Sequence, residues 1–351
     1  MQKYIFLLIS TFLIACSSDN QEITPTETFI KAADMSFLPL IEAEGVLFKN
    51  KENNTEDALQ TLKNAGCNTI RIRLWHTPES ATSSFNEVKS FCQRVRNKGL
   101  KIWLCVHYSD TWADPGHQQK PQAWENLTFQ QLKIEFENYT ATIAAELKPE
   151  IMQIGNETNS GFLFPEGNLM TNETQFLTLL AAGASKIRTH SPATKIMLHY
   201  AGIEGANWFF SKTTAIDFDY IGLSYYPIWH GKNLSLLEET IKTLGTTHQK
   251  KVCIAETAYP FTYNWNDWTN NIIGSSDQIL PNFEATPLGQ KNYLLQIQNS
   301  IKSSKFGAGF CYWGAEWVAF RGNQATNGSS WENQALWDFN LKALPVLEAF
   351  N

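Results

Sequence analysis

The amino-acid sequence predicts an α/β protein made of a single (β/α)8 barrel, the TIM-barrel architecture. From residue 29 onward, eight short apolar runs alternate with helix-like stretches, a pattern typical of βαβ units and a parallel sheet. No glycine-rich phosphate-binding loop interrupts the pattern, which favours a closed barrel over an open doubly wound sheet. Two of the runs end in a glutamate, and catalytic side chains project from the carboxyl ends of barrel strands.

The order of elements follows from the apolar runs and from the residues that interrupt them. The expected strands are residues 30–35, 69–74, 101–106, 151–154, 195–199, 220–223, 251–255 and 308–312. The expected helices between them are residues 55–65, 88–98, 129–147, 173–189, 234–243 and 287–303. Gly66 and Gly99 each stand between a helix and the next strand, where a residue that tolerates a left-handed conformation is favoured.

The residues before the barrel have the composition of an export signal. Lys3 precedes an apolar stretch, residues 4–15, that is too short to span a bilayer as a stable anchor. The stretch ends in Leu13-Ile14-Ala15-Cys16, which resembles the lipobox of bacterial lipoproteins, in which the chain is cut before the cysteine. We therefore expect residues 1–15 to be a lipoprotein signal peptide and Cys16 to carry the lipid, with an ordinary secretory signal as the alternative. Residues 16–28 are expected to be a flexible tether, and residues 29–351 one barrel domain.

Bulk composition narrows the classes of function. The chain has 351 residues, and 43 % of them are apolar, which is enough for one sizeable core. The net charge is −6 and no basic block occurs, so we expect no nucleic-acid partner. Five cysteines besides Cys16 are odd in number and not spaced for zinc, so we expect buried free thiols and no metal site. They are Cys67, Cys92, Cys105, Cys253 and Cys311.

Two strands with the same ending supply the central hypothesis. The run 151–154 leads through Gly155 into Asn156 and Glu157, and the run 251–255 leads into Glu256, 99 residues after Glu157. A single strand-end carboxylate often only caps the following helix. Two such glutamates, however, are what retaining glycoside hydrolysis needs, one as acid/base and one as nucleophile.

Other strand ends offer groups that can bind a sugar. Arg71 and Arg73 alternate with apolar residues, so each must face a partner or a site; a structural ion pair at the bottom of the barrel is the alternative. Aromatic rings at strand ends suit stacking on sugar faces, with core packing as the alternative. The further candidates for substrate binding are His107, Asp110, Trp112, Asn156, Tyr226, Trp229 and Trp313.

Several of these segments together resemble the signature of a known family. The matching motifs are His107-Tyr108-Ser109-Asp110-Thr111-Trp112-Ala113-Asp114-Pro115-Gly116, Gly155-Asn156-Glu157, Leu223-Ser224-Tyr225-Tyr226-Pro227, Glu256-Thr257-Ala258-Tyr259 and Asn333-Gln334-Ala335-Leu336. They are similar to those of glycoside hydrolase family 53, the arabinogalactan endo-β-1,4-galactanases, over roughly residues 30–350. The resemblance implies a retaining barrel enzyme that hydrolyses β-1,4-galactan, the type I arabinogalactan side chain of pectin.

The resemblance also implies roles for individual residues. By the family pattern Glu157 is the acid/base and Glu256 the nucleophile, supported by Arg71, His107, Asn156, Tyr226 and Trp313. We expect Arg71 to lower the pKa of Glu256, and the negative Glu256 to raise the pKa of Glu157. The chain departs from the usual pattern at Thr158, at Phe164-Pro165 and at Gly314-Ala315-Glu316. None of these departures touches a catalytic carboxylate, so they concern subsite preference.

The expected partners follow from this assignment. We expect β-1,4-galactan and its oligosaccharides as substrates, a membrane contact through the lipid on Cys16, and a monomer exported to the cell envelope, at the outer membrane or cell surface. No cofactor is expected. Some bacterial relatives bind calcium between the last two strands, but Asp267 and Asp277 are too few carboxylates to support it here.

Two other readings stay open at this point. Another retaining barrel glycosidase, such as a mannanase or xylanase, would share the two glutamates but not the segment 107–116. A non-catalytic surface glycan-binding lipoprotein would be expected to have lost one glutamate, whereas this chain has both.

Overall fold

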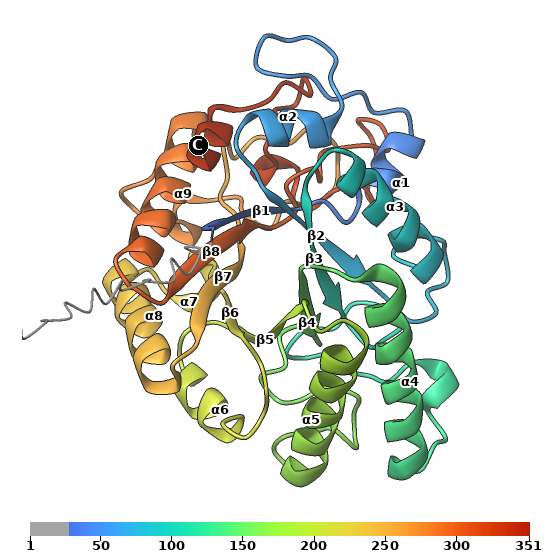
Figure 1. Ribbon diagram of the computed structural model, residues 1–351. Coiled ribbons are helices and arrows are strands. Elements are labelled where there is room, and N and C mark those ends of the chain that lie inside the picture. Colours follow the sequence, from blue (N-terminus) through green and yellow to red (C-terminus); the bar gives the residue numbers. More distant parts are fainter. Residues whose placement is uncertain (1–27) are drawn as a thin grey trace, which may run out of the picture.

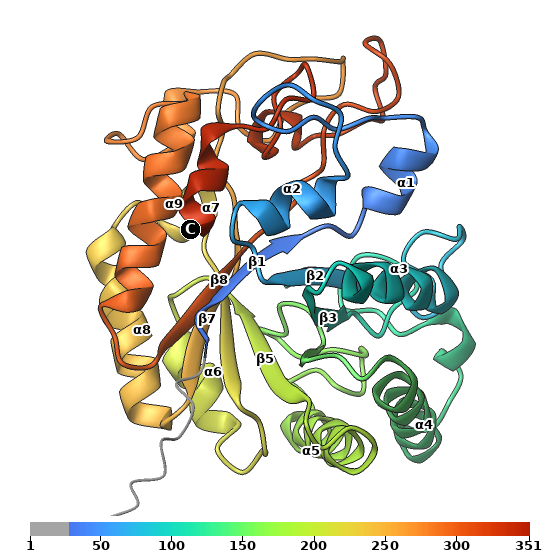
Figure 2. The ribbon, with the colours of Figure 1, turned by 45° about the horizontal axis from the view of Figure 1, so that its top comes forward.

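In the computed structural model, which describes residues 28–351, eight parallel strands form a closed barrel in the order β1 to β8. Figure 1 shows the strands at the centre with the helices around them, and Figure 2 shows the same arrangement tilted by 45°. The prediction of a single (β/α)8 barrel is thus confirmed. The proposed signal peptide, Cys16 and nearly all of the tether lie outside the described residues.

All eight strands lie where the sequence predicts them, with small shifts at their ends. Their bounds are β1 Ile30–Asp34, β2 Thr69–Leu74, β3 Lys101–Val106, β4 Ile151–Ile154, β5 Lys195–Ala201, β6 Tyr220–Ser224, β7 Lys251–Thr257 and β8 Gly307–Tyr312. The helices are α1 Leu38–Ala43, α2 Ala58–Asn64, α3 Phe85–Asn97, α4 Phe129–Leu147, α5 Glu173–His190, α6 Ala206–Lys212, α7 Pro227–His230, α8 Leu234–His248 and α9 Pro287–Lys302. Short 3-10 helices cover Gln122–Trp124, Ser276–Gln278, Glu332–Gln334 and Pro345–Phe350.

Side-chain caps fix the starts of α3, α4, α8 and α9, whereas the long helix α5 has no side-chain cap hydrogen bond. The Ser84 hydroxyl accepts the backbone N–H of Glu87 at the start of α3. Thr128 and Gln131 form a capping box at the start of α4, which satisfies two otherwise unpaired N–H groups. The short helices α1, α6 and α7, which the sequence did not predict, have no side-chain cap hydrogen bond.

Alternate residues of the strands pack in two separate hydrophobic clusters, one between the strands and the helices and one inside the barrel. In β2, Ile70, Ile72 and Leu74 pack outward in a large cluster with the helices. A second cluster contains only strand residues, among them Trp103 and Met197, and therefore fills the inside of the barrel. Arg71 and Arg73 belong to this inward-facing set. No helix of the described residues is long and apolar enough to cross a membrane.

Candidate active site

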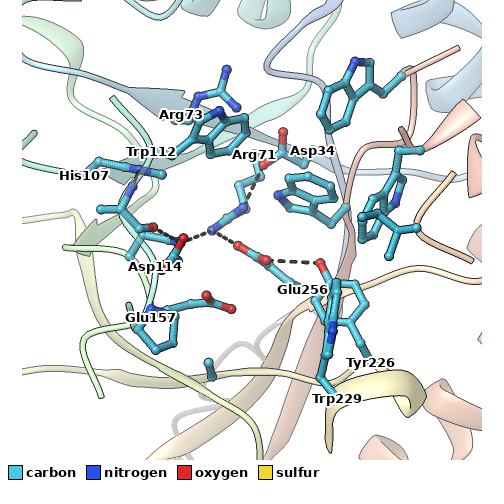
Figure 3. A pocket seen from close by; sticks show the side chains of 18 of the residues that line it. Asp34, Arg71, Arg73, His107, Trp112, Asp114, Glu157, Tyr226, Trp229 and Glu256 are labelled. Atoms are coloured by element: carbon cyan, nitrogen blue, oxygen red, sulfur yellow. Dashed lines mark hydrogen bonds and ion pairs between the residues drawn. The ribbon is translucent and has the colours of Figure 1, made fainter. Parts of the chain in front are cut away.

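A cavity of about 510 Å³ opens at the carboxyl ends of the strands. Figure 3 shows its side chains converging on the space between Glu157 and Glu256. Its polar and charged lining includes Asp34, Arg71, Arg73, His107, Asp114, Asn156, Glu157, Tyr226, His230 and Glu256, and its large aromatic lining includes Trp112, Trp229, Trp313, Trp317 and Trp331. The sequence-predicted residues are therefore brought together, with the exception of Asp110.

Glu157 reaches the cavity through an unusual backbone turn after β4. Gly155 has φ +75, and a side chain there would place its Cβ 2.5 Å from the Thr158 methyl carbon. Glu157 itself has φ +48, a left-handed conformation that non-glycine residues adopt rarely and mostly where the surroundings enforce it. The Thr158 backbone N–H donates to the carbonyl oxygen of His199 on β5 at 2.9 Å, which holds the turn against the neighbouring strand.

The two glutamates lie close together. A carboxylate oxygen of Glu157, one of Glu256 and a ring nitrogen of His199 are all within 4.8 Å of one another. Retaining glycosidases separate their two carboxyl groups by about 5–5.5 Å and inverting ones by about 6.5–9.5 Å. The spacing therefore matches retention and leaves no room for a water molecule between attacking group and sugar.

Arg71 ties the nucleophile candidate to the first strand. Its guanidinium contacts Glu256 Oε1 at 2.7 Å and Asp34 Oδ2 at 2.8 Å, and all three side chains are almost fully buried. Arg71 also donates to Asn156 Oδ1 at 3.0 Å. The alternative that Arg71 makes an ion pair at the bottom of the barrel is wrong, because its partners stand at the carboxyl end with the cavity.

The same contacts separate the two carboxyl groups electrostatically. Burial, and then the negative charge of Glu256, raise the pKa of Glu157 to about 8. Burial also raises the pKa of Glu256, but the Arg71 guanidinium opposes that rise. The Tyr226 hydroxyl also opposes the rise in the pKa of Glu256, because it donates a hydrogen bond to Glu256 Oε2 at 3.1 Å. Glu256 is therefore the member of the pair that ionises first, while Glu157 keeps its proton near neutral pH.

Two further predicted residues have their hydrogen bonds arranged toward the cavity. The Asn156 amide donates one hydrogen to the Ala113 carbonyl at 2.8 Å, which leaves its second amide hydrogen for a ligand. His107 Nδ1 accepts the Ala113 backbone N–H at 3.0 Å, so the neutral ring carries its hydrogen on Nε2. Burial lowers the pKa of His107 well below its ordinary value, which keeps the ring neutral.

An aromatic wall lines one side of the cavity and is built on Arg73. The Arg73 guanidinium carbon lies 4.0 Å from the Trp112 ring centroid and 4.4 Å from those of Phe37 and Trp75. Buried Glu316, one of the departures from the family pattern, accepts the Phe37 backbone N–H at 2.6 Å. Trp112 is therefore fixed from one side and presents its remaining surface to the cavity.

The aromatic lining continues from Trp112 through Trp313, whose ring centroids are 6.1 Å apart, to Trp331 and Trp229. The Trp229 and Trp331 rings stack at 6.2 Å, and Trp229 is 53 % exposed. Trp313 meets Trp331 edge to face at 4.7 Å. Gly314 has φ +62, and a Cβ there would lie 2.9 Å from Trp331, so this departure from the family pattern lets Trp331 approach the wall.

Asp110 is a correction to the sequence-based site. Its two carboxylate oxygens accept the backbone N–H groups of Thr77 and Gln122, each at 2.8 Å, and it is not among the cavity residues. These contacts join the loops after β2 and β3, so Asp110 organises the cavity rim from outside. Asp110 was predicted to bind substrate because His107 and Trp112, which are close to it in sequence, do line the cavity.

Several contributors to the site were not predicted. They include Asp34, Asp114, His230, Trp317 and Trp331 in the cavity lining, and Ser224, which contacts Glu157. Asp34 and Ser224 end strands β1 and β6, so the rule that flagged the glutamates could have found them. Trp331 comes from the long segment after β8, and no local pattern indicates that it folds back over the cavity.

Two groups of side chains in the described residues carry atoms of the kind that bind metals. Glu157, His199 and Glu256 have suitable atoms, but both ring nitrogens of His199 already contact protein groups, so we assign no ligand there. Where the segment after β7 meets the segment after β8, buried side-chain oxygens of Asp267, Asn271 and Glu332 have no hydrogen-bond partner. Three oxygens fall short of the six or more that calcium takes, and Asp277 is exposed, so we assign no calcium either.

A (β/α)8 barrel with two close strand-end glutamates defines a barrel glycoside hydrolase of the retaining kind. The model of glycosyl hydrolase family 53 matches residues 30–350, and the chain belongs to that family. It is 34 % identical to the arabinogalactan endo-β-1,4-galactanase of Cellvibrio japonicus, covering 98 % of this chain and 96 % of the relative. It is 31 % identical to the endo-β-1,4-galactanase of Bacillus subtilis, covering 92 % and 85 %. Among solved structures, the Ignisphaera aggregans GH53 catalytic domain superposes with a TM-score of 0.87 at 34 % identity, covering 92 % of this chain and 95 % of that one.

Proposed function

We propose that this protein is a retaining endo-β-1,4-galactanase that hydrolyses β-1,4-galactan by double displacement. The observation that carries the proposal is the pair Glu157 and Glu256, whose oxygens lie within 4.8 Å inside a tryptophan-lined cavity. Family membership and the printed activities of the relatives support the substrate.

In the first step Glu256 attacks the anomeric carbon of the galactosyl unit. Its lone pair forms a carbon–oxygen ester bond while the glycosidic bond breaks, and Glu157 gives its proton to the departing oxygen. Arg71 and Tyr226 contact the attacking carboxylate, so it is held in place and ionised before substrate arrives. The raised pKa of Glu157 keeps the acid proton available near neutral pH.

In the second step the same carboxyl group acts as a base. Once Glu256 is esterified its negative charge is gone, so the repulsion that raised the pKa of Glu157 is removed. The Glu157 carboxylate then takes a proton from water, whose oxygen attacks the anomeric carbon and breaks the ester. Two inversions at one carbon give a product of the original β configuration.

The surrounding groups bind and orient the sugar. The free amide hydrogen of Asn156 is placed to donate to the 2-hydroxyl, a contact that strengthens as positive charge develops on the ring. The flat face of galactose suits stacking on Trp112, Trp229 and Trp313, all of which line the cavity. This chemistry uses carboxyl groups alone, so the proposal includes no cofactor.

The proposal extends to location. Cys16 is proposed to carry a lipid that anchors a monomeric enzyme to the cell envelope, at the outer membrane or cell surface, supported by the lipobox-like sequence before it. The full-length chain should partition with membranes and Cys16→Ala should not. Membrane partitioning of Cys16→Ala equal to that of the natural chain would contradict this part.

Substrate choice is tested by incubating the protein with linear β-1,4-galactan, xylan and mannan and separating the products. We expect galacto-oligosaccharides of several lengths from galactan and little release from the other two. Release from mannan or xylan in preference to galactan would support the other retaining barrel glycosidases. Tight binding of galactan without any release would support a glycan-binding lipoprotein.

A further inference from the structure

Ser224, the last residue of β6, lies between a buried histidine and the acid/base glutamate. Its hydroxyl is 2.5 Å from Glu157 Oε1 and 3.0 Å from His199 Nε2. Ser224 and His199 are both fully buried. Neither residue is used in the two steps above, yet together they contact one oxygen of the carboxyl group that must transfer a proton in both.

The hydrogen bonds of His199 Nδ1 decide which atoms donate and which accept between His199, Ser224 and Glu157. His199 Nδ1 lies 3.3 Å from the backbone nitrogen of Glu157, whose N–H can only donate. It also lies 2.9 Å from the Gln153 amide nitrogen. The orientation of that amide is fixed, because Gln153 Oε1 accepts the Trp103 indole N–H and Gln153 Nε2 donates to the Gly155 carbonyl.

Nδ1 is therefore an acceptor, and the neutral ring carries its hydrogen on Nε2. In the opposite tautomer, the hydrogen on His199 Nδ1 could be accepted only by Asn156 Oδ1, at 3.2 Å. That hydrogen would also point at the N–H groups of the Glu157 backbone and the Gln153 amide, which are donors themselves. With the hydrogen on Nε2, His199 donates to the Ser224 oxygen. The Ser224 hydroxyl hydrogen is then left to point at Glu157 Oε1. Burial lowers the pKa of His199 well below its ordinary value, so the ring does not gain a second hydrogen.

We propose that His199 and Ser224 form a positioning pair that reserves Glu157 Oε1 as an acceptor, so that the catalytic proton is carried and exchanged on Oε2. This proposal rests on the proposed function. It assigns Glu157 Oε2 as the atom that gives a proton to the glycosidic oxygen in the first step and takes one from water in the second. The Ser224 hydrogen bond also stabilises the ionised form of Glu157, which is the base of the second step.

The charged and titratable groups around Glu157 come from several strands and set the background against which this contact acts. They are Arg71 on β2, Asp114 after β3, His199 on β5, Tyr226 after β6 and Glu256 on β7. Ser224, unlike these groups, is a neutral hydroxyl that donates a hydrogen bond to the Glu157 carboxylate, so its removal leaves the nearby charges unchanged.

The test is the pKa of Glu157 in Ser224→Ala, followed by the ¹³C resonance of the labelled carboxyl group, which is assigned by its absence in Glu157→Gln. Loss of a donor to the carboxylate should raise this pKa by about one unit. The basic limb of kcat/KM against pH should move upward by the same amount. Ser191→Ala, which removes a buried hydroxyl contact before β5, is the matched control and should leave both unchanged.

A second variant separates positioning from packing. His199→Phe keeps a ring of similar shape but removes both nitrogens, so it should shift the pKa of Glu157 in the same direction as Ser224→Ala. An unchanged pKa in Ser224→Ala, with the fold intact by near-ultraviolet circular dichroism, would overturn the proposal. If the natural protein did not cleave galactan but the pKa still moved, the proposed function would fail and the pairing would stand.

Discussion

The ionisable carboxyl group of Glu157 should lower the free energy of unfolding at neutral pH, so Glu157→Gln should be more stable than the natural protein there. The pKa of Glu157 is raised from its ordinary value of 4.5 to about 8 in the folded protein. Between these two values the folded state binds more protons than the unfolded state, so stability falls as pH rises. At 1.36 kcal/mol per pKa unit the upper limit is about 5 kcal/mol. Glu157 is partly exposed to the cavity, so we expect about 1–3 kcal/mol.

The assay is unfolding of the natural protein and of Glu157→Gln at pH 4 and pH 8. Near pH 4 the carboxyl group is mostly protonated in both states, so the two proteins should have nearly equal midpoints. At pH 8 the variant should be more stable. Glu238→Gln, on the exposed face of α8, is the control and should show no such pH-dependent gain. A difference between Glu157→Gln and the natural protein that does not grow from pH 4 to pH 8 would refute the reasoning.

Three further substitutions test the neighbouring groups. Arg71→Met leaves Asp34 and Glu256 buried without a cation, so unfolding titrations at pH 7 should show a loss of about 3–5 kcal/mol; a loss below about 1 kcal/mol would contradict this. Asp110→Asn should lower the thermal midpoint but leave KM for galactan unchanged, whereas a raised KM would restore Asp110 as a substrate-binding residue. Trp229→Ala, because its ring is 53 % exposed, should change stability by less than about 1 kcal/mol but raise KM for galactan roughly 3- to 10-fold; an unchanged KM would remove it from the binding surface.

Much of the fold could be predicted because buried parallel strands leave a strong trace in sequence. Each strand is a short apolar run between turn residues, and the eight runs found this way match the eight strands observed. The short helices α1 and α6 escaped prediction for the opposite reason. They have six and seven residues and no side-chain cap, so neither periodicity nor a cap signal marks them.

The residues of the site that could be predicted are those at or soon after the ends of strands. Glu256 directly follows an apolar run and Glu157 comes three residues after one, and the resemblance to a family assigned their expected roles. Contacts that depend on chain segments far apart in sequence left no local signal. The stacking of Trp331 on Trp229 joins residues about a hundred positions apart. The placement of Asp110 behind the rim depends on partners in two loops, which the sequence does not bring together.

The central claim, that Glu256 is the nucleophile and Glu157 the acid/base, is tested most directly by azide rescue. An aryl β-galactoside with a good leaving group needs no acid, so Glu157→Ala should still form the covalent intermediate and then stall without a base. Azide needs no general base, so it should restore turnover, by an amount within the ~10²–10⁴-fold that acid–base assistance is worth, and give a β-galactosyl azide. Glu256→Ala should give no β-configured azide. A β-galactosyl azide from Glu256→Ala, with Glu157→Ala left inert, would contradict the account and reverse the two roles.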